Sequence, residues 1–310
     1  MKKWKIALII NFRSNNNSAV GKWKTIEEEV MAMLSPHSDE ILLRSISDSE
    51  LSISTLIKAG YNVLIAVGGD GTVNSILNEL MEYQSSSVIL GAIGIGSSND
   101  FHKPLNHCIR NVPLKINPNN TLRQDVGKVD FTNESGVKIT RYFIVNSSLG
   151  VTAEANWLFN QNDFFLRMTK TKFLNMAIIY SAVKTILTHK NISVEMNYKH
   201  GSFKGKIANV AVLNSPHVSG TFIYDQDITT TDGNLGLNYC EDISRYELIK
   251  VLWDLSQGKF SGRKGRGSEF IKELSIISDG VIPLETDGEI WMAKDISFSV
   301  LPSALHVIQF

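Results

Sequence analysis

The stretch "AVGGDGTVNSILNEL" at residues 66–80 decides the fold of this chain, because an apolar strand ends there in three glycines around one aspartate and a helix follows. Glycines 68, 69 and 71 are expected to take positive φ and to uncover backbone N–H groups, with Thr72 as the N-cap. The positive end of the helix dipole would then favour phosphate. Asp70 suits such a place if Mg²⁺ or a reacting hydroxyl lies between it and the phosphate. A tight turn with a capping aspartate fits equally well.

The residues around this stretch alternate between strand and helix signals. Short apolar runs at 6–10, 41–43, 63–67 and 88–95 are separated by helical spacing at 23–33, 51–59 and 72–81. Gly60 suits the end of the second helix. This alternation predicts a parallel sheet covered by helices, in an α/β domain of residues 1–125.

The pattern changes after "NPNN" at residues 117–120. Short alternating strands follow from Gly127 onward, and one amphipathic helical stretch interrupts them at about 156–189. Many short strands predict a sandwich or barrel-like second domain over residues 126–310, whose last residues are free to return to the first domain. The predicted fold class is therefore α/β plus β.

Composition excludes several classes of protein. The 310 residues are 43% hydrophobic, and 31 basic residues balance 31 acidic ones, so no global field attracts nucleic acid. Cys108 and Cys240 lack the spacing of a zinc or redox site. The apolar run at 6–10 is too short for a signal peptide, and no stretch is long enough to span a membrane. We expect a cytoplasmic protein.

A second loop, "GAIGIGSSNDF" at residues 91–101, also follows an apolar strand. Loops at the carboxyl ends of neighbouring parallel strands face the same crevice. The P-loop and dinucleotide fingerprints are both absent. Together the two loops resemble the diacylglycerol kinase catalytic-domain family. Four further stretches, in the family's order, extend the resemblance: "IINFRSN" (9–15), "RQDVGKV" (123–129), "RYFIVNSSLGVTAE" (141–154) and "TTTDGNLGL" (229–237). "IPLETDGEI" (282–290) completes it as a fifth.

The resemblance implies an N-terminal domain like that of NAD kinase and phosphofructokinase, a C-terminal β-sandwich, and use of ATP and Mg²⁺. It implies that ATP contacts come from two sets of residues. The loops supply Gly69, Asp70, Gly71, Thr72, Val73, Asn74, Ser75 and Ser97, and other segments supply Asn11, Ser45 and Glu289. Asn15 replaces the family's glycine in the first segment, which leaves open whether nucleotide binding is weaker.

The resemblance also implies catalytic and metal-binding roles for aspartates. Asp287, in "TDGE", is the expected proton acceptor, although an Asp-Gly hairpin turn explains the same dipeptide. Asp70 competes for that role, and we favour metal binding and orientation for it. Asp100 and Asp125 are expected around hydrated Mg²⁺, although a turn-capping role explains each of them as well. Asp232, with carbonyls near Thr229 and Asn234, is expected around a structural metal, and an isolated Asp-Gly turn is the alternative.

The favoured function is phosphorylation of a lipid hydroxyl, with diacylglycerol converted to phosphatidic acid. The alternatives are an NAD kinase-like phosphotransferase and a non-catalytic nucleotide- or lipid-binding regulator. The helical stretch at 156–189 carries aromatic and lysine side chains that suit a membrane surface, although packing on its own domain is the commoner reason for such a helix. Expected partners are therefore a lipid at the inner face of the membrane and no nucleic acid, and a homodimer remains open.

Overall fold

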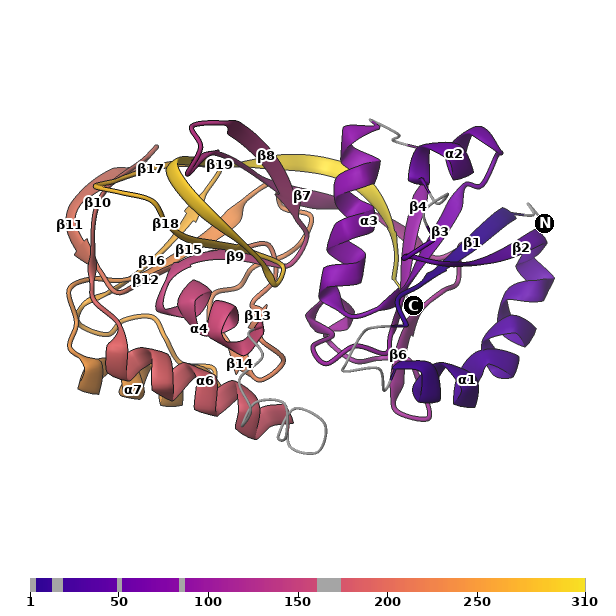
Figure 1. Ribbon diagram of the computed structural model, residues 1–310, viewed down its shortest axis with the longest axis horizontal. Coiled ribbons are helices and arrows are strands. Elements are labelled where there is room, and N and C mark those ends of the chain that lie inside the picture. Colours follow the sequence, from indigo (N-terminus) through magenta and orange to yellow (C-terminus); the bar gives the residue numbers. More distant parts are fainter. Residues whose placement is uncertain (1–3, 13–18, 49–51, 84–86, 161–173, 310) are drawn as a thin grey trace. The chain divides into compact units, whose positions relative to one another are not determined.

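The computed structural model describes the chain except residues 1–3, 13–18, 49–51, 84–86, 161–173 and 310. Two compact units are present (Figure 1). Unit 1 comprises Met1–Gln124 and Ser303–Phe310, and unit 2 comprises Asp125–Pro302. Two strands cross this boundary, β7 (Thr121–Asn133) and β19 (Glu289–Ile308).

Unit 1 is built on a parallel sheet with the strand order β2-β1-β3-β4. The order reverses between β1 and β3, so the chain leaves these two strands in opposite directions along the sheet. The end of β19 adds a parallel strand beside β4, and β6 adds an antiparallel one, so the sheet is mixed. The elements of this unit are β1 (Trp4–Ile10), α1 (Ala19–Leu34), β2 (Ser38–Ser45), α2 (Ile53–Lys58), β3 (Val63–Gly68), α3 (Asp70–Glu82), β4 (Ile89–Gly94), β5 (Cys108–Ile109) and β6 (Val112–Lys115), with short 3₁₀ turns at Ser35–His37 and Asp100–His102.

The central strands β1, β3 and β4 are largely apolar because both faces of the sheet are covered there, whereas the edge strand β2 is half polar. Every residue of β3 is buried. Alternate residues such as Ile65 and Val67 pack with Trp23, Ile26 and Val30 of α1 in one hydrophobic cluster. Leu64 and Ala66 point to the opposite face and are equally buried. The predicted α/β architecture is confirmed.

Unit 2 is an antiparallel β structure. Its ladder runs in the order β11-β10-β17-β19-β18-β9-β12-β15-β16, and each neighbouring pair is antiparallel. Inward-facing residues form one core, in which Phe143 meets Phe298 edge to face. The strands are β8 (Lys138–Phe143), β9 (Asn146–Gly150), β10 (Ile192–Tyr198), β11 (Gly201–Ile207), β12 (Asn209–Leu213), β13 (His217–Val218), β14 (Phe222–Ile223), β15 (Leu235–Cys240), β16 (Arg266–Ile271), β17 (Glu273–Ser278) and β18 (Ile282–Thr286), besides β7 and β19.

The helices of unit 2 differ from the prediction. The expected single helix over 156–189 is wrong, because α4 (Val151–Asn160) and α6 (Leu174–Thr188) pack against each other and cannot form one straight rod. Phe164, Phe165 and Phe173, with Lys170 and Lys172, lie outside the described residues. A further helix, α7 (Arg245–Ser256), was not expected. Its sequence signal is a capping box, in which Ser244 and Glu247 each bond the other's backbone N–H.

None of the helices in the described part of the chain has the length and hydrophobicity needed to cross a membrane.

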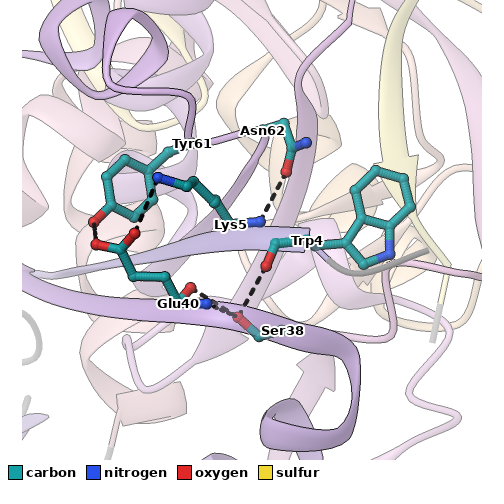
Figure 2. A network of polar contacts seen from close by, with 6 residues as sticks. All are labelled: Trp4, Lys5, Ser38, Glu40, Tyr61 and Asn62. Atoms are coloured by element: carbon teal, nitrogen blue, oxygen red, sulfur yellow. Dashed lines mark hydrogen bonds and ion pairs between the residues drawn. The ribbon is translucent and has the colours of Figure 1, made fainter. Parts of the chain in front are cut away.

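A polar network joins the amino ends of β1 and β2 to the residues before β3 (Figure 2). Lys5 pairs with Glu40 at 3.1 Å, and the Tyr61 hydroxyl donates to the same carboxylate at 2.6 Å. The Asn62 side chain accepts from the Lys5 backbone N–H, and the Ser38 hydroxyl donates to the Trp4 carbonyl. These contacts hold together the amino ends of the strands, and the glycine loops lie at the carboxyl ends.

Candidate functional site

Two glycine loops meet at the carboxyl ends of β3 and β4. We call residues 68–71 the first glycine loop and residues 94–101 the second glycine loop. The Gly96 N–H donates to the Gly68 carbonyl at 3.1 Å. A Cβ on Gly96 would stand only 2.3 Å from the Gly69 Cα, closer than any such contact allows. The loops therefore need glycine because their backbones touch.

This reason differs from the one that the sequence suggested. Gly68, Gly69 and Gly71 are not among the described residues with positive φ, so that expectation is wrong. The helix α3 begins at Asp70 with Gly69 as N-cap, which places Thr72 inside the first turn instead of at the cap. Gly68 has no side chain because a Cβ there would lie 2.1 Å from the Thr72 hydroxyl oxygen. Steric closeness, and not an unusual backbone conformation, selects these glycines.

Asp70 joins the two loops. Its carboxylate oxygens accept the backbone N–H groups of Asp100 and Phe101, each at 3.0 Å. A carboxylate in the first turn of a helix also lies at the favourable end of the helix dipole. Asp70 is thus both an acidic group at the phosphate-type loop and a clamp between the loops.

Two other predicted residues lie at the same edge of the sheet. The Asn11 N–H, directly after β1, donates to the Val67 carbonyl at the end of β3, and the Asn11 side chain donates to the Thr72 hydroxyl at 3.1 Å. Ser45 is the last residue of β2 and lies opposite Ile10 in the pairing with β1. Asn11 and Thr72 therefore stand where the strand order reverses between β1 and β3, and Ser45 lies at the carboxyl end of the neighbouring strand β2. Asn15 lies outside the described residues.

The remaining predicted nucleotide contacts are on α3 and in the second glycine loop. The Val73 side chain is buried, and the Thr72 and Val73 N–H groups both donate to the Gly69 carbonyl. Asn74 is also buried and accepts from the Asn78 side chain. Ser75 and Ser97 are half-buried. In this conformation the side chains of Val73 and Asn74 support the helix.

Asp100 is a buried carboxylate in the second glycine loop. It pairs with Lys103 at 2.8 Å and accepts the Ser98 hydroxyl at 2.9 Å. Phe101 and His102 follow it and pack near Lys115 of β6, whose amine lies 4.6 Å from the Phe101 ring centroid. Burial lowers the pKa of Lys115 to about 8, and burial together with the Lys115 charge lowers that of His102 to about 3. This basic group beside the loop was not predicted from the sequence, because only the β4–β6 pairing brings it there.

In unit 2, Asp287 occupies the turn between β18 and β19. Asp287 and Gly288 both have positive φ, 46° and 92°, as a two-residue hairpin requires. The carboxylate also accepts three backbone N–H groups, from Ile144 at 2.8 Å, Val145 at 3.0 Å and Asn146 at 2.9 Å. The hairpin turn accounts for the Asp-Gly dipeptide, and the three donors in addition stabilise the ionised form of the carboxylate.

Two glutamates flank this turn. Burial raises the pKa of Glu289, and the charge of Arg141 opposes that rise. Glu285 is buried, and its carboxylate accepts the Ser148 hydroxyl at 2.7 Å and the Gly288 N–H at 2.5 Å. Glu285 and Ser148 were not predicted from the sequence. The acidic Glu285 within the largely apolar strand β18 could have indicated a buried polar contact.

Asp125 fixes a second turn in unit 2. Its carboxylate accepts the Gly233 N–H at 2.7 Å, and its own N–H donates to the Thr230 carbonyl at 2.7 Å. The buried Asn214 side chain donates to the Asp125 and Ile144 carbonyls, and so links this turn to Ile144, whose N–H donates to Asp287. Asn214 was also missed, because its partners are distant in sequence.

Asp232 is exposed and accepts the Asn234 N–H at 2.8 Å. The described residues contain no group of three or more acidic, histidine or cysteine side chains that could hold a metal ion. An ion at this turn would have to be held by the Asp232 carboxylate and by carbonyl oxygens near Thr229 and Asn234. Hydrogen bonds within the turn already account for its geometry.

Comparison with known proteins matches both halves of the chain. The diacylglycerol kinase catalytic domain matches residues 5–130, and the YegS C-terminal NAD kinase beta sandwich-like domain matches residues 146–309. The chain belongs to the diacylglycerol kinase catalytic-domain family. Membership of this kinase family supports a phosphotransferase of the lipid kinase type.

Relatives in this family include two staphylococcal proteins. The "Putative lipid kinase SH2167" of Staphylococcus haemolyticus (strain JCSC1435) is 24% identical over 253 residues, which cover 80% of this chain and 77% of the relative. The "Putative lipid kinase SAS0691" of Staphylococcus aureus (strain MSSA476) is 25% identical over 255 residues, with the same coverage of 80% and 77%.

Solved structures share the fold. A diacylglycerol kinase crystal structure from Bacillus anthracis str. Sterne superposes with a TM-score of 0.70 at 15% identity, covering 99% of this chain and 97% of that one. A second structure from the same organism, titled "A putative diacylglycerol kinase", gives a TM-score of 0.73 at 17% identity, with coverage of 100% and 98%.

Proposed function

We propose that this chain is an ATP- and Mg²⁺-dependent lipid kinase that transfers the γ-phosphoryl group to a lipid hydroxyl, with diacylglycerol as the acceptor. The observation that carries the proposal is the closure of two glycine loops on each other at the carboxyl ends of β3 and β4, beside the strand-order reversal between β1 and β3. The two halves of the chain match the diacylglycerol kinase catalytic domain and the YegS C-terminal domain. Open parallel sheets bind ligands at this position.

The residues fit a nucleotide phosphate chain. The first glycine loop runs directly into the N-terminus of α3, where the dipole and the early N–H groups favour an anion. A Cβ on Gly71 would meet nothing within 4 Å, so the backbone there is open to close approach. Asn11, Gly69, Thr72, Ser45 and Ser97 would add polar contacts at the same edge.

The residues also fit Mg²⁺ bound together with the nucleotide. Mg²⁺ keeps several waters and takes one or two carboxylates plus substrate phosphates, so a cage of three protein carboxylates is not needed. Each Asp70 oxygen accepts one backbone N–H, and a carboxylate is a ligand type that Mg²⁺ takes. When bound, the ion neutralises phosphate charge. Asp100 and Asp125 would orient waters, and Asp232 with the carbonyls near Thr229 and Asn234 would hold a separate structural ion.

Asp287 is the proposed proton acceptor for the lipid hydroxyl. Its three N–H donors keep it ionised and hold it in one orientation, which a general base needs. Asp70 keeps its proposed role at the loops, because its two oxygens hold the Asp100 and Phe101 N–H groups of the second glycine loop. Glu289, two residues after Asp287, is proposed to contact the nucleotide.

The acceptor can be identified by one assay. Labelled ATP and Mg²⁺ are supplied with diacylglycerol, phosphatidylglycerol, a sphingoid base or NAD, and the label is followed into each. We expect label in phosphatidic acid. Transfer to NAD alone would refute a lipid kinase, and no transfer to any acceptor would favour a binding regulator.

The base is tested by Asp287→Asn, because asparagine also tolerates positive φ. Turnover should fall by about 10² to 10⁴-fold while ATP still binds. The amide nitrogen of Asn accepts no N–H group, so at least one of the three donors loses its partner, and the melting temperature is measured alongside. Asp279→Asn is the matched control, since Asp279 precedes Gly280 in an exposed Asp-Gly pair. Near-normal turnover of the folded Asp287 variant would exclude it as the base.

A further inference from the structure

Helix α7 has two apolar faces, and only one of them is buried. Leu248, Val251 and Leu255 pack into a hydrophobic cluster of unit 2. Tyr246, Ile249 and Trp253 lie on the opposite side, 68%, 42% and 69% exposed. Their spacing of three and four residues aligns them along the helix. We call these three residues with Lys250 the α7 ridge.

The chemistry of the α7 ridge is that of a membrane interface. Tyrosine and tryptophan have an apolar body and a polar tip, which suits them to the level of lipid headgroups. The Lys250 amine lies 4.5 Å from the centroid of the Tyr246 ring, so a positive charge sits among the exposed apolar side chains. The neighbouring helix α6 also exposes Ile179 and Leu187. Figure 1 shows α6 and α7 along the same edge of unit 2.

Exposed basic residues continue beyond the helix. Lys259, Arg263 and Lys264 are all exposed in the segment that follows α7. Hydrogen bonds from the Ser244 backbone and hydroxyl lower the pKa of Glu247, and the charges of Lys250 and Lys264 lower it further. Lys264 therefore lies near the first turn of α7. The acidic residues of the helix are already engaged, Glu247 in the capping box and Asp254 in a 2.8 Å pair with Arg266.

We propose that the α7 ridge, together with Lys259, Arg263 and Lys264, docks this protein on an anionic lipid bilayer. Tyr246, Ile249 and Trp253 would enter the headgroup region, and the basic side chains would lie against lipid phosphate. The docking proposal rests on the proposed function in one respect: a lipid kinase has to reach an acceptor that lies in a bilayer.

Charge favours a bilayer over a second copy of this chain. The chain has no net charge, yet residues 241–267 carry six basic and four acidic side chains. Two copies meeting ridge to ridge would bring Lys250 and its basic neighbours together, and like charges repel in such an interface. An anionic surface complements both the charge and the aromatic residues.

Vesicle sedimentation tests the docking without any need for catalysis. The full chain is mixed with phosphatidylcholine vesicles that contain or lack phosphatidylglycerol. We expect binding to the anionic vesicles and about tenfold or greater loss in the double variant Tyr246→Ser/Trp253→Ser. Lys250→Gln and Lys264→Gln should each reduce binding about fivefold at low salt. Ile277→Ser and Lys272→Gln, exposed residues near β17, are the matched controls and should bind normally.

Activity measurements separate this proposal from the proposed function. With a dispersed short-chain diacylglycerol, the ridge variants should keep wild-type turnover, and with vesicles they should lose it. Vesicle binding without transfer to any lipid would overturn the kinase assignment and leave the docking intact. Equal vesicle binding by wild type and folded ridge variants would overturn the docking. The docking would also be overturned if analytical ultracentrifugation showed that the wild type is a dimer and the ridge variants are not, while vesicle binding stayed unchanged.

Discussion

The two ends of the sheet in unit 1 are held together in different ways. At the amino ends of β1 and β2, long side chains make the contacts, as in the Lys5–Glu40–Tyr61 network (Figure 2). At the carboxyl ends of β3 and β4, backbone meets backbone, with the Gly96 N–H on the Gly68 carbonyl. The Lys5–Glu40 pair tolerates substitution because both side chains are about half exposed and can adjust. Backbones in contact do not tolerate an added side chain. The end of the sheet that tolerates less substitution is therefore the one that we propose for the nucleotide.

The largest effect is expected from Gly96→Ala. The new Cβ would collide with the Gly69 backbone, which cannot move without opening both loops, so the free energy of unfolding should fall by about 2–3 kcal/mol. Thermal or denaturant unfolding measures this loss. ATP binding should be lost as well.

Gly71→Ala, in the first glycine loop, is the matched control. Nothing lies within 4 Å of a Cβ there, so stability should stay unchanged or rise slightly. Weaker ATP binding by this stable variant would show that a ligand approaches the backbone at Gly71. If Gly96→Ala and Gly71→Ala lowered stability equally, the loops would not be in tight contact at Gly96 and open at Gly71, as the structure has them.

A smaller effect is expected from Asp70→Asn. The amide has one oxygen for the two N–H groups of Asp100 and Phe101, so one charge-assisted hydrogen bond is lost and stability falls by about 1–2 kcal/mol. The readouts are the melting temperature and the Mg²⁺ dependence of turnover. A stability loss with unchanged Mg²⁺ dependence would make Asp70 a clamp only. A changed Mg²⁺ dependence would support its proposed place beside the ion.

The smallest effect is expected at the opposite end of the sheet, from Glu40→Gln. The Tyr61 hydroxyl and the Lys5 amine lower the pKa of Glu40, so its contribution to stability is present above the ordinary value of 4.5 and is lost as pH falls through the folded value. The melting temperature should drop by about one or two degrees at neutral pH, and the difference should vanish in acid. Turnover should not change. Glu134→Gln, an exposed glutamate outside the network, controls for the loss of surface charge.

Much of the fold was predictable because its signals are local. The apolar run before Gly68 and the helical spacing after it specify β3 and α3 within a few residues of their bounds. The capping box before α7 was equally local, but the surrounding strand signals obscured it. Both faces of α7 are apolar, which blurs the periodicity that reveals an ordinary surface helix.

The sequence by itself determined the two architectures, the glycine loops and the Asp-Gly turn, because each depends on residues within a few positions of one another. The contacts that these residues make depend on the tertiary structure. Asp70 meets amides 30 and 31 residues away, and Asp287 meets amides 141 to 143 residues away. Gly96 is glycine because of Gly69, which belongs to another strand's loop. Contacts between distant segments arise from strand order and register, and no short stretch of sequence contains that information.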